Sequence, residues 1–270
     1  MQPTFNRHEP DFDVLHRVSE GLFTFVTRFQ FGEIPLHNRS LIVHVPTASS
    51  DGRGSLVIIN PAELSASIRA AIEELEQQSN AVVRYLISPG DWHHLFIEQH
   101  ARAFPHARAH VPPGRIPAQS PAYEYATIDV LADNPFPELA PHLQISIFRG
   151  LVDFLDPARP RKRPRYELVF HHPASRTITS GDVLYYSGAD ALTPEESARG
   201  LHLRTLGFHF LKWQLIGDPQ AVARSLERIL QWDFAHYISI HGGPGNMLER
   251  EAKAHIESLL TWAKAPPTDG

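Results

Sequence analysis

Three segments of the chain share a pattern suited to metal chemistry, in which an apolar run ends in a metal-competent side chain beside glycine. They are L-I-S-P-G-D-W-H-H (86–94), T-I-T-S-G-D-V-L-Y-Y (177–186) and I-S-I-H-G-G-P-G (238–245). Functional groups collect in loops beyond strand ends, because the strands fix the position of a loop that itself needs no burial. Three imidazoles and a carboxylate with one open position suit Zn²⁺ or Fe²⁺. The side chains offered are Asp91, His93, His94, Asp182 and His241.

Each of these ligand candidates also has a structural explanation when it is taken alone. Adjacent histidines such as His93 and His94 are common at the exposed start of a helix. An aspartate after glycine, such as Asp182, is typical of a turn. His241 fits a buried, hydrogen-bonded histidine at the end of a strand. The metal interpretation therefore depends on all of them lying at matching strand ends.

Three residues are candidates for supporting roles near such a centre. Asp91 could be a general base that takes a proton from an activated water, or it could cap the helix predicted to follow it. His171 and His172 end another predicted strand, so their side chains point to opposite faces. One of them could be a hydrogen-bonding neighbour of the ligands or a substitute ligand, and the alternative for both is a structural role.

The composition is that of an ordinary globular protein and narrows the chemistry. Of the 270 residues, 42% are hydrophobic and 20% are charged, and 17 are histidine, the commonest metal-ligating side chain. The lack of cysteine excludes thiolate ligands and cysteine nucleophiles. A net charge of -5 disfavours nucleic acid as a partner, and no apolar run approaches the roughly 20 residues that cross a bilayer. Because no secretory signal is visible, we expect a cytoplasmic protein without nucleic-acid or membrane partners.

Hydrophobic periodicity predicts strands and helices in a layered order. Apolar runs predict strands over 21–31, 39–45, 54–60, 81–87, 143–148, 166–171, 181–186 and 235–240. Helical spacing predicts helices over 61–78, 94–104, 218–230 and about 247–263. Asn60 before Pro61 is expected to cap the first helix, and Asp218 before Pro219 the third. The order indicates an α/β fold.

No repeat, low-complexity region or long linker divides the chain. We therefore expect one domain over 13–264 with tails at 1–12 and 265–270, and a helical insertion over about 193–232. The basic stretch R-P-R-K-R-P-R at 159–165 fits a solvated hairpin tip, with a site for an anionic substrate or partner as the alternative.

The motifs and the element order resemble those of the metallo-β-lactamase-like superfamily. Its first signature, Thr-His-x-His-x-Asp-His between a strand and a helix, is similar to S-P-G-D-W-H-H at 88–94. Its later Ser/Thr-Gly-Asp motif resembles S-G-D at 180–182, and its closing strand-to-His-Gly loop resembles H-G at 241–242. The resemblance covers roughly residues 15–262 and is closest to a divergent branch. It implies a four-layer αββα sandwich with metals at the strand ends of two packed sheets.

The departures from the family pattern imply one metal site in place of two. Pro89 and Asp91 stand where the signature has its first two histidines, which implies that the family's first metal site is lost. The ligand positions of the second metal all hold residues that can still ligate. These are His93, His94, Asp182 and His241.

We therefore expect one divalent metal ion, zinc in preference to iron, at these four ligands with water in an open position. The expected function is hydrolysis of an ester, thioester or amide of a small molecule, with Asp91 as the base. An iron-dependent oxidoreductase with the same ligands is an alternative. A degenerate fold that binds no metal and serves as a binding module is another. No motif indicates the substrate or the oligomeric state.

Overall fold

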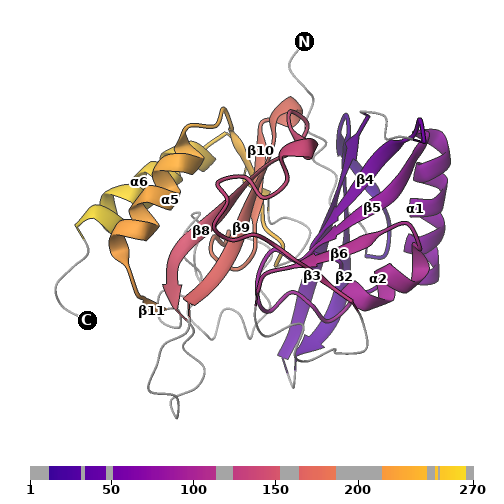
Figure 1. Ribbon diagram of the computed structural model, residues 1–270, viewed down its shortest axis with the longest axis horizontal. Coiled ribbons are helices and arrows are strands. Elements are labelled where there is room, and N and C mark those ends of the chain that lie inside the picture. Colours follow the sequence, from indigo (N-terminus) through magenta and orange to yellow (C-terminus); the bar gives the residue numbers. More distant parts are fainter. Residues whose placement is uncertain are drawn as a thin grey trace.

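Two β-sheets pack face to face, and helices cover the outer face of each (Figure 1). The computed structural model describes residues 12–31, 34–46, 51–113, 124–152, 164–186, 215–241, 247–248 and 250–265. Helices α1 and α2 lie against the first sheet, and α5 and α6 against the second. The predicted four-layer αββα sandwich is confirmed.

The first sheet is formed by the N-terminal half of the chain. Its seven strands lie in sequence order. They are β1 (His16–Ser19), β2 (Leu22–Phe31), β3 (Ile34–Val45), β4 (Gly54–Ile59), β5 (Ala81–Ile87), β6 (Arg108–Val111) and β7 (Ala126–Thr127). Strands β1 to β4 are antiparallel, whereas β4 to β7 run parallel, with a helix between β4 and β5 and another between β5 and β6. These helices are α1 (Ala66–Gln78) and α2 (Ile97–Ala103).

The second sheet has six strands in the order β11-β8-β9-β10-β12-β13. They are β8 (Gln144–Val152), β9 (Pro164–His172), β10 (Thr177–Ser180), β11 (Leu215–Ile216), β12 (His236–Ile238) and β13 (Met247–Leu248). Helices α5 (Pro219–Leu230) and α6 (Ala252–Lys264) cover it, and short 3₁₀ helices occupy Pro137–Leu139 and Pro173–Ser175. The connection from β10 to β12 passes through α5, which gives the sheet one parallel pair.

The core follows from the alternation of side chains along the strands. In β3, Leu41, Val43 and Val45 face the second sheet, while Ile42 faces the helices. Strand β4 is buried along its whole length because both of its faces are covered. A third apolar layer joins the second sheet to α5 and α6. The apolar layer between the sheets contains residues of both sheets and holds them face to face.

Several predicted boundaries are wrong for local reasons. Helix α1 begins at Ala66, because Ser65 and not Asn60 is its cap: Ser65 Oγ accepts a hydrogen bond from the backbone N–H of Ile68. The region 181–186 is not a strand, and 247–248 is a strand of the second sheet where a helix was expected. The cap at Asp218 is confirmed, since its side chain accepts from the N–H of Ala221.

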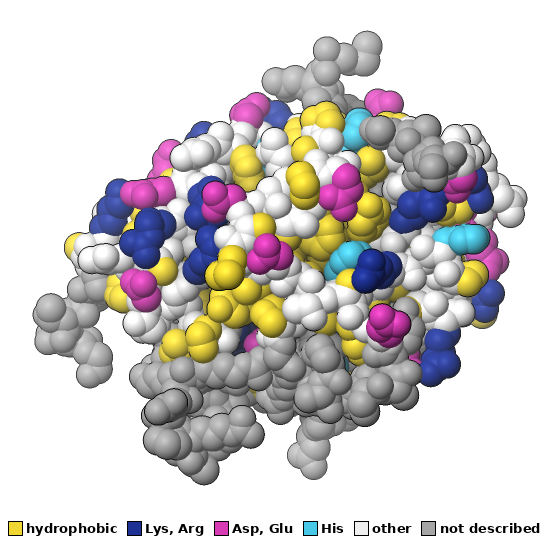
Figure 2. Space-filling model, in the orientation of Figure 1, with side chains coloured by type: hydrophobic (Ala, Val, Ile, Leu, Met, Phe, Trp, Pro, Cys, Tyr) yellow, Lys and Arg dark blue, Asp and Glu magenta, His cyan; other side chains and the backbone are white. Residues whose placement is uncertain are grey.

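The expected helical insertion lies largely outside the described residues, as do both expected tails except for a few residues. Within the described part of it, α5 and the short strand β11 are present. Among the described helices, none is long and apolar enough to cross a membrane. Over the described part of the face in Figure 2, Lys and Arg side chains are interspersed with Asp and Glu side chains.

Candidate metal centre

Two of the predicted ligands are brought together by the parallel pair β10 and β12. In this pair Thr179 lies opposite Ile238. Asp182 and His241 each follow three residues later, so the two side chains leave the same edge of the second sheet next to each other. Their proximity is therefore a consequence of strand register and of equal loop lengths.

A third ligand comes from the first sheet, in the loop that follows β5. Ser88 is buried and fixes this loop, because its Oγ lies 2.8 Å from the carbonyl oxygen of Gly90 and 2.9 Å from that of His93. The loop is also tied to the second sheet, since the backbone N–H of Leu168 donates to the carbonyl of Pro89 at 2.7 Å. His93 is thereby held across the interface between the sheets.

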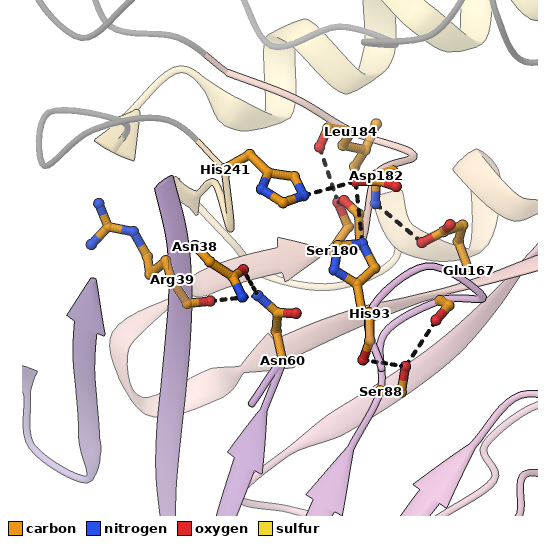
Figure 3. A network of polar contacts seen from close by, with 12 residues as sticks. Asn38, Arg39, Asn60, Ser88, His93, Glu167, Ser180, Asp182, Leu184 and His241 are labelled. Atoms are coloured by element: carbon orange, nitrogen blue, oxygen red, sulfur yellow. Dashed lines mark hydrogen bonds and ion pairs between the residues drawn. The ribbon is translucent and has the colours of Figure 1, made fainter. Parts of the chain in front are cut away.

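The three side chains converge on one carboxylate oxygen (Figure 3). Oδ1 of Asp182 lies 3.2 Å from Nε2 of His93 and 3.1 Å from Nε2 of His241. One ligand atom from each residue lies within 4.8 Å of the other two, and the imidazole centroids are 5.3 Å apart. We refer to His93, Asp182 and His241 as the triad. Two imidazoles and one carboxylate form a donor set that suits zinc or non-haem iron.

The hydrogen bond of His241 leaves its second ring nitrogen, Nε2, facing the carboxylate of Asp182. Its Nδ1 lies 3.1 Å from the carbonyl oxygen of His37, so in the neutral ring the proton is on Nδ1 and the lone pair is on Nε2. That lone pair faces the Asp182 carboxylate, an arrangement that is favourable only when a proton or a metal ion lies between the two atoms. Oδ1 of Asp182 and Nε2 of His93 are buried, and within the described chain neither makes a hydrogen bond of acceptable geometry.

The electrostatics of the triad favour the states that ligate metals. Burial lowers the pKa of His93, with the carboxylate of Asp182 acting in the opposite direction. Burial opposes ionisation of Asp182, but its contacts with His93 and His241 hold the pKa of Asp182 well below its usual range. A neutral imidazole and an ionised carboxylate are the forms that a divalent cation requires.

The middle of β3 positions His241. Asn38 pairs with His241 in an isolated antiparallel bridge, and the N–H of Arg39 donates to the carbonyl of Ile240 at 2.9 Å. Asn60, at a φ of 53°, donates from Nδ2 to the side-chain oxygen of Asn38 and to the carbonyl of Arg39, both at 2.7 Å (Figure 3). The residue predicted to cap a helix therefore fixes the part of β3 that pairs with His241.

An ion pair that sequence analysis missed lies directly behind the triad. Arg165 donates to Oδ2 of Asp182 at 2.9 Å and, through Nε and Nη2, to Oε1 of Glu167 at 2.9 and 2.6 Å. All three side chains are buried. Burial opposes the charge on Arg165, but Glu167 and Asp182 raise its pKa above the ordinary value. Burial raises the pKa of Glu167 to about 8, against the lowering effect of Arg165.

Gly90 and Gly181, from the first two predicted motifs, leave room for the pair of Arg165 and Glu167. Gly90 forms an isolated bridge with Glu167, and Gly181 approaches the same carboxyl group from β10. A Cβ at either position would overlap the carboxyl group of Glu167. Oε2 of Glu167 also accepts the backbone N–H of Asp182 at 3.1 Å. Glu167 therefore links the motif of the first sheet to that of the second.

His94 and Asp91, the other two candidates of the first motif, are not part of the triad. His94 is half-buried, and within the described chain it does not belong to the group whose ligand atoms converge. Asp91 is buried, and its charge contributes to the raised pKa of Glu167. Asp91 does not cap α2, because the cap position is Phe96 and makes no side-chain cap hydrogen bond.

The expectation that His171 or His172 adjoins the ligands is wrong. In the β9–β10 pair they lie opposite Ile178 and Thr177, at the far end from Asp182. Nδ1 of His171 lies 2.9 Å from the amide oxygen of Gln144, and Nδ1 of His172 lies 2.8 Å from Ser175 Oγ. Burial lowers the pKa of each to about 4. Both rings have structural roles at the opposite end of the sandwich.

The interpretation of the basic stretch also changes at its last residue. Residues 159–163 lie outside the described residues, but Arg165 is buried in the site and is not part of a solvated tip. The signal that could have revealed it is strand alternation. Arg165 and Glu167 are two residues apart in a strand, and so they lie on one face with opposite charges.

Comparison with known proteins supports the fold. No protein-family model matches the sequence, and no curated protein matches it. Among solved structures, the metallo-β-lactamase FIM-1 from Pseudomonas aeruginosa, in its mono-zinc form, is 13% identical over 97% of this chain and 100% of that chain, with a TM-score of 0.55. A metallo-β-lactamase from Erythrobacter litoralis is 13% identical over 92% and 95%, with a TM-score of 0.56.

A third match is a flavodiiron protein and is not named as a β-lactamase. The flavodiiron core of Flv1 from Synechocystis sp. PCC6803 is 12% identical over 93% of this chain and 60% of that chain, with a TM-score of 0.58. The chain has the metallo-β-lactamase fold. At these identities the likeness shows the fold alone, and the chemistry must be argued from the triad.

Proposed function

We propose that this chain is a metal-dependent hydrolase with one metal ion, held by His93, Asp182 and His241. The observation that carries the proposal is the convergence of two imidazole nitrogens on one buried carboxylate oxygen, at 3.1 and 3.2 Å. The substrate class we propose is an ester, thioester or amide of a small molecule, and zinc is the preferred metal.

The charge of the buried triad supports a bound cation. Asp182 is buried, and its pKa is held well below the usual range, so its carboxylate is ionised. A buried negative charge is costly unless it is compensated. Arg165 donates to Oδ2 of this carboxylate, and a bound cation would compensate the charge at Oδ1, which faces the two imidazoles.

Zinc is supported by the donor set and by the fold. Zinc is commonly held by histidine and carboxylate ligands, and a catalytic zinc has three protein ligands with one position left open. FIM-1, which shares the fold, has been crystallised in a mono-zinc form. In the proposal His94 is not a ligand, which leaves the fourth position to water or substrate.

The residues of the site would then have separate roles. A divalent ion, when bound, supplies Lewis acidity and lowers the pKa of water. Asp91 would accept the proton of the attacking water as general base, and Arg165 would hold Asp182 in its ligating orientation. The two hydrogen-bonded loops that carry His93 and His241 keep the ligands in place from both sheets.

An iron-dependent oxidoreductase is the second candidate. Two histidines and one carboxylate are also the donor set of mononuclear non-haem iron sites. The flavodiiron core of Flv1 has the same fold. Metal identity in the purified protein therefore separates the two enzyme classes.

The test of the hydrolase is an Asp91→Asn variant assayed on a panel of p-nitrophenyl esters and acyl thioesters. We expect kcat/KM to fall by about 10²–10⁴-fold while metal content stays unchanged, because Asp91 moves a proton and does not ligate. Asp51→Asn, on the exposed Arg84–Asp51 pair, is the matched control and should keep full activity. Hydrolysis that survives unchanged in Asp91→Asn would exclude this role for Asp91. A metal-free, inactive wild-type protein would instead favour a non-catalytic binding module.

A further inference from the structure

Asp182 presents its two carboxylate oxygens to two different kinds of neighbour. Oδ1 faces Nε2 of His93 and of His241. Oδ2 accepts a hydrogen bond from Nη2 of Arg165 at 2.9 Å, and the same nitrogen lies 2.6 Å from Oε1 of Glu167. One guanidinium nitrogen therefore bridges two carboxylates, which is the place that a cation shared between two carboxylates would take.

This bridging position is built into the interior. The side chains of Arg165, Glu167 and Asp182 are 8%, 0% and 7% exposed. Gly90 and Gly181 lie so close to the Glu167 carboxyl group that neither position has room for a Cβ. Glu167 is further fixed by the backbone N–H of Asp182 at 3.1 Å. The carboxyl groups of Glu167 and Asp182 are thus held in place, and the space between them is filled by the Arg165 guanidinium.

We propose that the Arg165 guanidinium occupies the place and supplies the charge of a second cation, which limits the centre to one metal ion. The metal at Oδ1 of Asp182 rests on the proposed function, whereas the claim made here concerns Oδ2 and the space beside it. A metal ion at Oδ2 would need the oxygen atoms and the volume that Arg165 takes up. The groups around that volume are the carboxyl groups of Asp182 and Glu167. Such an oxygen-rich set suits Mn²⁺ or Mg²⁺ better than it suits zinc.

Three substitutions of Arg165 separate the effect of its charge from the effect of its volume. Arg165→Ala removes both the charge and the bulk, Arg165→Met removes the charge but fills the volume, and Arg165→Lys retains a cation. Arg149→Ala is the control, because this guanidinium lies on the neighbouring strand β8 and donates to the carbonyls of Val130 and Ala132. Each metal-free protein is titrated with Mn²⁺, with free Mn²⁺ followed by electron paramagnetic resonance and bound metal confirmed by elemental analysis. Circular dichroism and thermal unfolding with and without Mn²⁺ report whether each variant folds.

The expected result is that Arg165→Ala binds about one equivalent more than the wild type, and that its Tm rises more on addition of Mn²⁺. The Met, Lys and Arg149→Ala proteins should bind as many equivalents as the wild type. A folded Arg165→Ala protein with no extra equivalent overturns the proposal. So does a wild-type protein that binds two equivalents, a result that does not depend on the folding of any variant. Because the readout is the difference between variant and wild type, it stands even if the triad binds no metal and the proposed function fails.

Discussion

Strand β9 joins two ends of the sandwich where histidines have different surroundings. At the first end, the triad places two imidazole nitrogens around a buried carboxylate, with Arg165 and Glu167 behind it. At the far end, the nitrogens of His171 and His172 are already bonded to amide, carbonyl and hydroxyl oxygens. The difference shows that histidine count does not make a metal site. A carboxylate and converging nitrogen atoms distinguish the candidate centre from a structural pair.

The largest expected effect is a loss of stability when the ion pair of Arg165 and Glu167, behind the triad, is broken. Glu167→Ala should lower the free energy of unfolding by about 3–5 kcal/mol, because Arg165 loses the acceptor of two of its hydrogen bonds, Oε1 of Glu167, while remaining buried. Urea unfolding of the metal-free protein measures this loss. Glu73→Ala, which removes the exposed Arg69–Glu73 pair, is the control and should cost less than about 1 kcal/mol. A cost below about 1 kcal/mol at Glu167 would show that the pair does not hold this end together.

The buried histidines at the far end, His171 and His172, should make the free energy of unfolding depend on pH. Burial lowers the pKa of His171 and His172 to about 4, whereas in the unfolded chain histidine titrates near 6.5. Between these values the unfolded chain binds protons that the folded chain does not, so stability falls as the pH is lowered from about 6.5 through 4. Urea unfolding at a series of pH values should show this slope. It should be shallower in a His171→Gln, His172→Gln variant, and an unchanged slope would contradict the assignment of these rings as buried and neutral.

The smallest effect is expected at His94, the predicted ligand that lies outside the triad. His94→Ala should keep its metal and change the metal affinity only a few-fold, because three ligands suffice for a catalytic zinc site. Competition with a chromophoric chelator measures the affinity. Loss of the metal in this variant would restore the four-ligand arrangement that the sequence motif implied.

The layers of the fold could be predicted because they follow from local patterns. Apolar patterns located the longer strands, β2 to β5 in the first sheet and β8 and β9 in the second, as well as β12, and the Asp218-Pro219 pair marked the start of α5. The resemblance to a known fold then supplied the pairing of the sheets, which periodicity alone does not give. Boundaries failed where a side chain had a tertiary role, as at Asn60, which binds the middle of β3 instead of starting a helix.

The triad was partly visible in the sequence because each ligand follows a strand beside glycine. The sequence did not show that His93 belongs to the triad and His94 does not, since adjacent residues in a loop can point in any direction. Arg165 was missed because a basic run resembles a solvated tip, and Glu167 because a charged residue in a strand is ordinarily placed on the solvent face. Their pairing depends on the approach of the first sheet's loop through Gly90, which is a contact between distant parts of the chain.

The most direct test of the central claim is the metal content of purified, tag-free protein by elemental analysis. Wild type is compared with a triad variant, His93→Ala with His241→Ala, and with the far-end variant, His171→Gln with His172→Gln. We expect about one equivalent of zinc or iron in the wild type and in the far-end variant, and almost none in the triad variant. Equal metal contents in all three proteins, or no metal in the wild type after incubation with Zn²⁺ and Fe²⁺, would contradict the claim.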